Sequence, residues 1–427
     1  MDITTQLAIQ WQNPSNILLL LFVLGGDIVQ HAIAQLFGVY VQPSQNWPRL
    51  YLTPVAFSFG WVGYAFKSLA SVLGDKQLMP SEPDCPSSVI NCSSGYGRTN
   101  RSWILGRILR DHELAVEENP GPEYANLDAT GKTVSLRIDI FKMQENEKPQ
   151  IDRVWVLGWL AIIAQLEISM IPWIQDGDWS IFLITACGTI FALLTGSLRQ
   201  WNLEKWAGRR LNKPGSTEKK DKNKVVCLTR GNGHRHAMVF FGNGTAWDLE
   251  SLATASSAPL AETPWLLGIL AVLWGFLFVV VSGLQQNTWF LVLIGGIGMI
   301  QNIYASVARR PASAFNISIE PYQPRPSIVG LGFEVPHDDE TSDEDLDDTT
   351  GQWQQPLDYE ATPGVRGAIR ELEKVFPKAG VALMQEFFPA LIKYEPARYR
   401  TNAEKKFWKR AFHQFGMPVP SKHAMDE

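Results

Sequence analysis

Apolar and polar positions are distributed unevenly along this chain, in long apolar runs separated by polar segments. The apolar runs occupy residues 17–40, 51–73, 154–174, 179–198, 265–283 and 289–307. A helix rises about 1.5 Å per residue, so roughly 20 apolar residues cross a hydrocarbon layer of about 30 Å. The pattern therefore predicts about six transmembrane helices.

The predicted fold class is an all-α membrane protein with cytosolic loops. Helices are expected because a segment isolated in lipid must satisfy its own backbone hydrogen bonds, and the runs are longer than barrel strands. Between the fourth and fifth helices we expect a small α+β insert. After the sixth we expect a partly disordered C-terminal tail.

The same pattern divides the chain into six parts. Three carry a pair of predicted transmembrane helices each, and three are predicted to lie in the cytosol. The membrane parts are residues 1–73, which include an N-terminal segment, 153–201 and 264–308; the cytosolic parts are 74–152, 202–263 and 309–427.

Charge supports this arrangement and gives it an orientation. A mean hydropathy of -0.07 and 19% charged residues would suit a soluble protein, but the charges lie almost entirely between the apolar runs. Lys and Arg follow the second, fourth and sixth runs, whereas the opposite connections contain only Arg49. Because basic residues favour the cytosolic side, we expect a multi-pass protein with both termini in the cytosol.

The polar segments contain weaker local patterns. Val134 to Ile140 alternates like a strand, and residues 225–229 and 236–241 flank a glycine-containing turn typical of a β-hairpin. Residues 103–110 predict a short amphipathic helix on the membrane surface. In the tail we expect a disordered acidic run at 337–348 and helices at 363–394 and 402–415, the first with an apolar face.

Ionisable residues within the predicted transmembrane helices are candidates for chemistry. Asp27 and His31 share one helix face, and Glu167 is predicted at a similar depth. Together they could relay protons, bind a cation or act as general acid and base. The alternative is structural, with Asp27 paired with His31 or with Lys67, whose own position lets its ammonium reach the interface.

A second candidate is a metal site. His234 and His236, with Asp248 and Glu250 downstream, are residue types that bind zinc. Alternate residues of a strand point to one face, so two such histidines are more often a solvated surface. No other cofactor is expected.

Three segments carry a resemblance to a known family. They are residues 228–233, residues 246–250 and the Phe59 to Tyr64 stretch of the second apolar run. On these the chain resembles a family of uncharacterised multi-span integral membrane proteins of filamentous fungi, over roughly residues 17–310. The resemblance implies a fungal membrane and a setting in secondary metabolism, because some members are encoded in secondary-metabolite gene clusters.

Three functions fit these patterns. The favoured one is an accessory or scaffold component of fungal secondary-metabolite biosynthesis, with the lipid bilayer and pathway enzymes as partners and no nucleic acid. The first alternative is a proton-coupled transporter of an organic solute that uses Asp27, His31 and Glu167. The second is a membrane-embedded enzyme that acts on a lipophilic substrate with the same residues; an enzyme is not favoured, because no catalytic motif is present.

Overall fold

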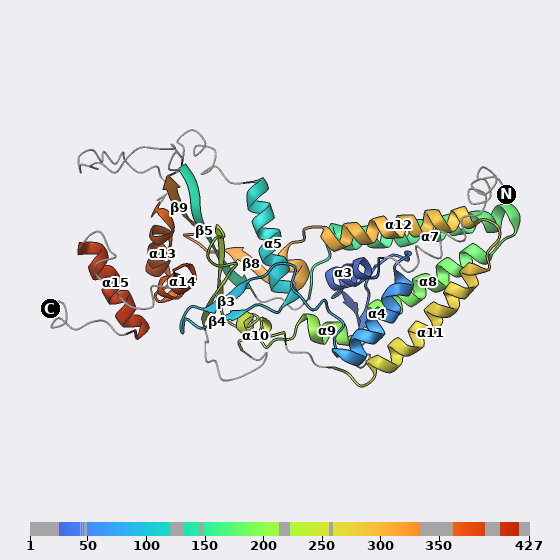
Figure 1. Cartoon of the computed structure of the whole chain (residues 1–427), viewed down its shortest axis with the longest axis horizontal. Coiled ribbons are helices and arrows are strands. Elements are labelled where there is room, and N and C mark those ends of the chain that lie inside the picture. Colours follow the sequence, from blue (N-terminus) through green and yellow to red (C-terminus); the bar gives the residue numbers. More distant parts are fainter. Residues whose placement is uncertain are drawn as a thin grey trace, which may run out of the picture.

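A computed structural model shows a bundle of long helices joined to a domain built on a β-sheet (Figure 1). The structure describes residues 25–42, 44, 46, 49–119, 132–144, 148–212, 223–255, 259–333, 362–388 and 402–417. The bundle lies at one end of the molecule and the sheet domain at the other (Figure 1).

Four helices form the bundle as two hairpins. The first hairpin is α7 (Arg153–Asp176) and α8 (Ser180–Gly196); the second is α11 (Thr263–Ser282) and α12 (Thr288–Val307). Both hairpins start and end beside the sheet domain, and their turns lie at the far end of the molecule (Figure 1). The Asp178 carboxylate accepts a hydrogen bond of 3.0 Å from the Asn287 amide, which joins the two turns.

Three of these helices, α7, α11 and α12, are long and apolar enough to cross a membrane. A fourth crossing is counted if α8 and the short α9 (Arg199–Lys205), bent by 43° from it, are taken as one broken helix. The expectation of six transmembrane helices is therefore wrong for the described residues.

The first two predicted transmembrane helices account for the difference. They are replaced by α3 (Gly26–Leu36), of 11 residues, and α4 (Trp61–Gly74), of 14 residues. At about 1.5 Å per residue, neither reaches about 30 Å. Residues 52–58 form neither helix nor strand, partly because Pro54 cannot donate a backbone hydrogen bond, and residues 59–60 form a turn before α4. Residues 17–24 lie outside the described part of the chain.

The all-α prediction is wrong because the polar segments build an eight-stranded sheet. Seven strands lie in the order β10-β9-β5-β7-β6-β3-β4, and β8 pairs with β5 beside β9. The strands are β3 (Ser88–Asn91), β4 (Gly97–Thr99), β5 (Lys132–Gln144), β6 (Lys224–Thr229), β7 (His236–Gly242), β8 (Ser318–Pro321), β9 (Ser327–Phe333) and β10 (Thr362–Pro363). The strands come from all three segments that were predicted to be separate cytosolic parts, so these segments form one domain.

The sheet is the middle layer of three. On the bundle side, Leu228, Met238 and Phe240 pack against α5 (Trp103–Glu118), in a core that continues into the bundle. On the opposite face, Cys227 and Val239 belong to a second core. That core includes α13 (Gly364–Val375), α14 (Ala379–Phe387) and α15 (Asn402–Phe415). The alternation of faces along each strand explains why both sides of β6 and β7 are apolar.

Several local predictions are confirmed. β6 and β7 form the expected antiparallel hairpin, and β5 contains the strand expected at Val134 to Ile140. The helix expected at 402–415 is α15, and Ile369 and Leu372 of α13 are buried on one face as predicted. The helix expected at 103–110 forms within α5, but it is buried in the core rather than placed on a membrane surface. The acidic run lies outside the described residues.

Candidate functional site: the apolar belt and its charged junction

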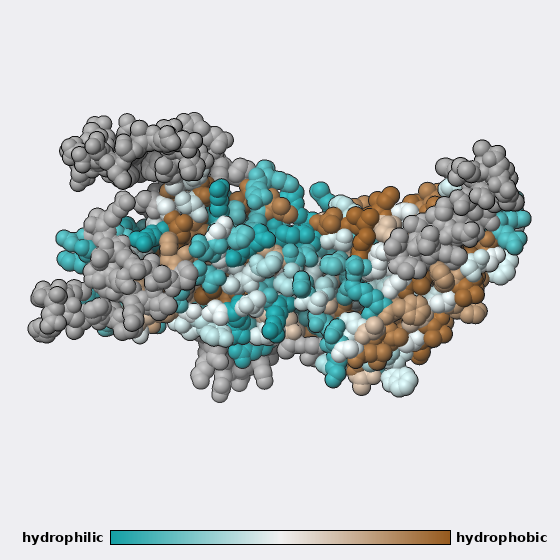
Figure 2. All heavy atoms as spheres, viewed as in Figure 1, coloured by the Kyte–Doolittle hydropathy of each residue, from teal (hydrophilic) through white to brown (hydrophobic). Residues whose placement is uncertain are grey.

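The outer surface of the bundle is a belt of exposed apolar side chains, defined here as the apolar belt. Figure 2 shows hydrophobic residues gathered over the helical end of the molecule and hydrophilic ones over much of the sheet domain. Its most exposed large members, at 59% or more, are Ile174, Trp265, Ile269, Val272, Phe276, Val279, Ile300 and Val307. A contiguous surface of this extent would be unstable in water, so it requires an apolar environment or a partner.

Tryptophans and charges mark the two ends of the apolar belt. Trp173, Trp179 and Trp289 are exposed near the hairpin turns, and Trp265 is exposed at the opposite end. Indole rings favour the boundary between hydrocarbon and water. The turns at residues 175–179 and 283–288 contain no Lys or Arg, whereas the ends beside the sheet domain carry several.

The centre of the bundle is filled by residues 53–60, which form neither helix nor strand and are defined here as the core segment. It is buried throughout. Small residues on the surrounding helices make room for it. A Cβ on Gly298 would overlap the Phe57 carbonyl oxygen, and a Cβ on Gly158 would overlap that of Pro54. The groove that receives the core segment therefore depends on glycine.

Polar side chains from the helices bind the backbone of the core segment. The Gln165 amide donates to the carbonyl of Phe57 at 2.6 Å. The Asn302 amide donates to the carbonyl of Ala56 at 3.1 Å, and the Gln301 carbonyl oxygen accepts from the Ala56 N–H at 3.2 Å. A backbone that is neither helix nor strand needs such partners in an apolar interior, because each unpaired group would cost several kcal/mol.

Buried charges join the bundle to the sheet domain, at a site defined here as the charged junction. Arg310, which follows α12, donates twice to the Asp152 carboxylate, at 2.6 and 2.8 Å, and once to the Gln35 carbonyl. Asp111 of α5 accepts from the Arg310 backbone N–H at 3.1 Å. The guanidinium of Arg310 thus connects α3 to the start of α7.

Lys205 and Arg107 extend the charged junction at the ends of α3 and α12. The buried Lys205 ammonium donates to the Phe37 carbonyl at 2.7 Å and lies 5.2 Å from the Trp206 ring centre. Arg107 donates to the Ala308 carbonyl at 2.8 Å and pairs with Asp84. Cations here satisfy carbonyls that the helix ends leave free.

The predicted intramembrane group does not assemble. Asp27 pairs with Lys67, as the structural alternative predicted, and both side chains are substantially exposed, at 74% and 47%. His31 contacts the Asp27 carbonyl at 2.8 Å rather than its carboxylate. Glu167 is exposed on the outer face of α7. The structure thus brings Asp27, His31 and Lys67 together and places Glu167 apart from them.

The predicted metal ligands are also separated. His234 is exposed in the turn before β7, and His236 begins β7. Asp248 and Glu250 instead share the Lys224 ammonium, each at 2.6 Å. Within the described ranges, no group of three or more His, Cys, Asp or Glu side chains is arranged to hold a metal.

Sequence reasoning missed one titratable cluster on the sheet. Asp139 of β5 accepts from Arg137 at 2.9 Å and lies 2.8 Å from the His112 ring nitrogen of α5. Burial opposes ionisation of Asp139, but the hydrogen bond with His112 and the Arg137 cation lower its pKa below the usual range. His112 lies 27 positions before Asp139 in the chain, so local periodicity gave no signal for their contact.

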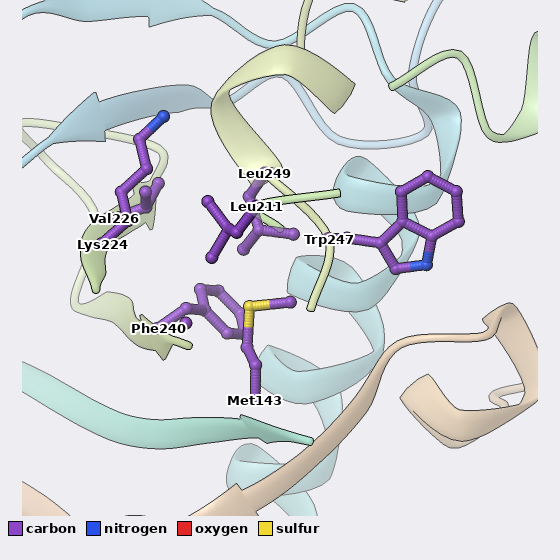
Figure 3. A pocket seen from close by; sticks show the side chains of 8 residues that line it. Met143, Leu211, Lys224, Val226, Phe240, Trp247 and Leu249 are labelled. Carbon is purple, nitrogen blue, oxygen red and sulfur yellow. The ribbon is translucent and has the colours of Figure 1, made fainter. Parts of the chain in front are cut away.

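A narrow crevice without room for a water molecule lies beside β6 and β7. Figure 3 shows apolar side chains, among them Met143, Phe240 and Leu249, that face one another there, while the Lys224 ammonium points away from them. That ammonium is bound by the two carboxylates described above. The crevice is therefore a gap in apolar packing and presents no reactive group.

Comparisons with protein-family models, curated proteins and solved structures found no match to this chain. The resemblance to fungal membrane proteins therefore stays a prediction.

Proposed function

We propose that this chain is an integral membrane protein that holds its sheet domain against the cytosolic surface of a bilayer. The observation that carries the proposal is the apolar belt, together with the tryptophans at its two ends. A helix of 20 residues, such as α11 or α12, matches a hydrocarbon thickness of about 30 Å. If α8 also crosses, each hairpin crosses the membrane twice. All segments that connect the helices to the sheet domain then lie on the same side of the membrane.

The orientation follows from charge. Arg153, Arg199 and Arg309 lie at the domain ends of the helices, and the hairpin turns have no basic residue. Basic residues near helix ends favour the cytosolic side. The sheet domain would therefore face the cytosol, and the hairpin turns the lumen or the cell exterior.

We further propose an accessory or scaffold role rather than transport. The core segment occupies the middle of the bundle, where a solute pathway would run, and Gln165 and Asn302 bind its backbone there. A rigid bundle that shares its core with a cytosolic domain suits a fixed support for other proteins. The resemblance suggests enzymes of specialised metabolism as those partners.

Labelling of single cysteines in sealed microsomes, whose cytosolic face is outward, tests the membrane arrangement. Gln286→Cys lies in a hairpin turn, and Asn232→Cys lies in the sheet domain; both positions are exposed. An impermeant maleimide should label Asn232→Cys directly and Gln286→Cys only after detergent is added. Direct labelling of both, or release of the protein by alkaline carbonate, would contradict the proposal.

The accessory role is tested by metabolite profiles of cells and medium with and without the gene. Loss of one compound from both compartments, with accumulation of a precursor, is expected for a component of synthesis. A compound that is still made but retained inside the cells would instead support transport and overturn the scaffold role.

A further inference from the structure

Two cations meet on one aromatic ring where the apolar belt ends beside the sheet domain. The guanidinium carbon of Arg49 lies 4.8 Å from the centre of the Tyr40 ring, and the Lys148 ammonium lies 5.1 Å from it. Both cationic side chains are exposed. Within the described part of the chain, no carboxylate forms an ion pair with either of them. Like charges gathered in this way attract an anion.

The surrounding fold holds this ring in place. Tyr40 belongs to β1 (Tyr40–Val41), which pairs with β2 (Leu50–Tyr51). The Tyr40 ring packs edge-on against Tyr51 at 5.7 Å, and Tyr51 stacks on Phe37 at 4.7 Å. The platform beneath the cations is therefore built from packed aromatic rings.

A third cation lies near the same platform. Arg49 and Arg199 are both close enough to the Tyr51 phenol to oppose the rise in its pKa that burial causes. The nearest acidic partner of Arg199 is Glu262, at 3.6 Å, and both side chains are largely exposed. Among the described residues, the charges of Arg49 and Lys148 are therefore not cancelled by an ion pair.

Exposed apolar side chains border the cations. Val41, Leu50 and Ile151 are 46%, 55% and 59% exposed. The Trp155 indole of the first turn of α7 donates to the Leu52 carbonyl at 3.3 Å, which places β2 at the level where the apolar belt begins. A free anion needs only the cations, whereas a lipid needs an apolar surface directly beside them.

We propose that Tyr40, Arg49 and Lys148 form a binding site for the headgroup of an anionic phospholipid. This inference rests on the proposed membrane location. The phosphate and any further acidic group contact Arg49 and Lys148, and the acyl chains lie along Val41, Leu50 and the start of α7. Anionic lipids are abundant in the cytosolic leaflet, which is the side predicted for these residues.

The test uses the full-length protein in detergent, with phosphatidylserine or phosphatidylcholine added and lipid retention measured by native mass spectrometry. The Arg49→Gln, Lys148→Gln double variant should lose affinity for phosphatidylserine on the order of tenfold. The matched control is Arg235→Gln, Lys406→Gln, which removes the same charge from exposed positions on the sheet domain. The control should keep the preference for phosphatidylserine, as should the charge-conserving variant Arg49→Lys, Lys148→Arg.

Equal phosphatidylserine retention by the double variant and its control would overturn the inference. So would full displacement of the lipid by millimolar inorganic phosphate, since that identifies a site for free anions. Because both substituted side chains are exposed, thermal unfolding of the double variant should match that of the native chain. A protein that stays in carbonate-washed membranes but shows no lipid preference would contradict only this inference, whereas extraction by carbonate would contradict the membrane proposal itself.

Discussion

At the scale of single residues, glycine decides how closely the core segment approaches the helices. In α12, Gly298 faces the Phe57 carbonyl, whereas Gly296, two positions earlier, has nothing within 4 Å of an added Cβ. The same residue type thus has a steric role at one position and none at the other. Gly295 resembles Gly298, because a Cβ there would overlap the Phe59 ring.

This difference makes Gly298→Ala and Gly296→Ala a matched pair. Gly298→Ala should displace the core segment and destabilise the protein by about 2 kcal/mol or more, because an overpacked core forces the backbone to move. Gly296→Ala should be neutral or slightly stabilising, since alanine favours a helix. Thermal unfolding of the purified variants in detergent measures both. Equal unfolding temperatures for the two variants would show that the groove is not tight.

At the scale of elements, the core segment and α4 show how polar groups permit an irregular backbone inside an apolar bundle. Residues 51–73 are apolar enough to predict one continuous helix. The helix begins only at Trp61, and the residues before it obtain hydrogen bonds from side chains of α7 and α12. Such backbone is tolerated at membrane depth where protein surrounds it.

Substitutions of Gln165 and Glu167 on α7 test whether helix side chains stabilise the core segment through its backbone hydrogen bonds. Gln165→Leu should lower stability by about 1–3 kcal/mol, because the Phe57 carbonyl loses its buried donor. Glu167→Leu should not lower it, because that side chain faces outward from the bundle. Unfolding temperatures in detergent report both effects. A loss for Glu167→Leu as large as that for Gln165→Leu would restore Glu167 as part of an internal polar group.

At the scale of the whole molecule, the charged junction and the shared core determine how the bundle and the sheet domain are joined. Residues from α3, α5, α7 and the end of α12 meet at Arg310 and Asp152. A buried ion pair adds little net stability compared with apolar packing, but removal of one partner is costly. The junction therefore fixes the relative position of the two parts.

The two neighbouring arginines after α12 test whether the charged junction holds the bundle and the sheet domain together. Arg310→Ala should destabilise the protein by about 3 kcal/mol, because the partly buried Asp152 carboxylate and the Gln35 carbonyl lose the guanidinium that pairs with them. Arg309→Ala removes only an exposed pair with Glu118 and should cost less than about 1 kcal/mol. Limited proteolysis should cut the first variant faster at the segments between bundle and sheet. The same proteolysis rate in both variants would show that Arg310 does not hold the two parts together.

The sequence by itself determined the features that depend on neighbouring residues. The last two apolar runs became α11 and α12 because each is long, predominantly apolar and free of charged residues. The β6–β7 hairpin and α15 followed from local alternation and helical periodicity.

Only the tertiary structure decided the features that depend on distant partners. β5 pairs with β7, which follows one helical hairpin in the chain, and with β9, which follows both, and no local pattern encodes such pairing. The apolar composition of the core segment alone predicted a helix, but its backbone is irregular in the structure, where Gln165, Gln301 and Asn302 supply its hydrogen bonds. Hydrophobicity is a property of a residue and can be counted along a chain, whereas the satisfaction of buried polar groups is a property of the assembled structure.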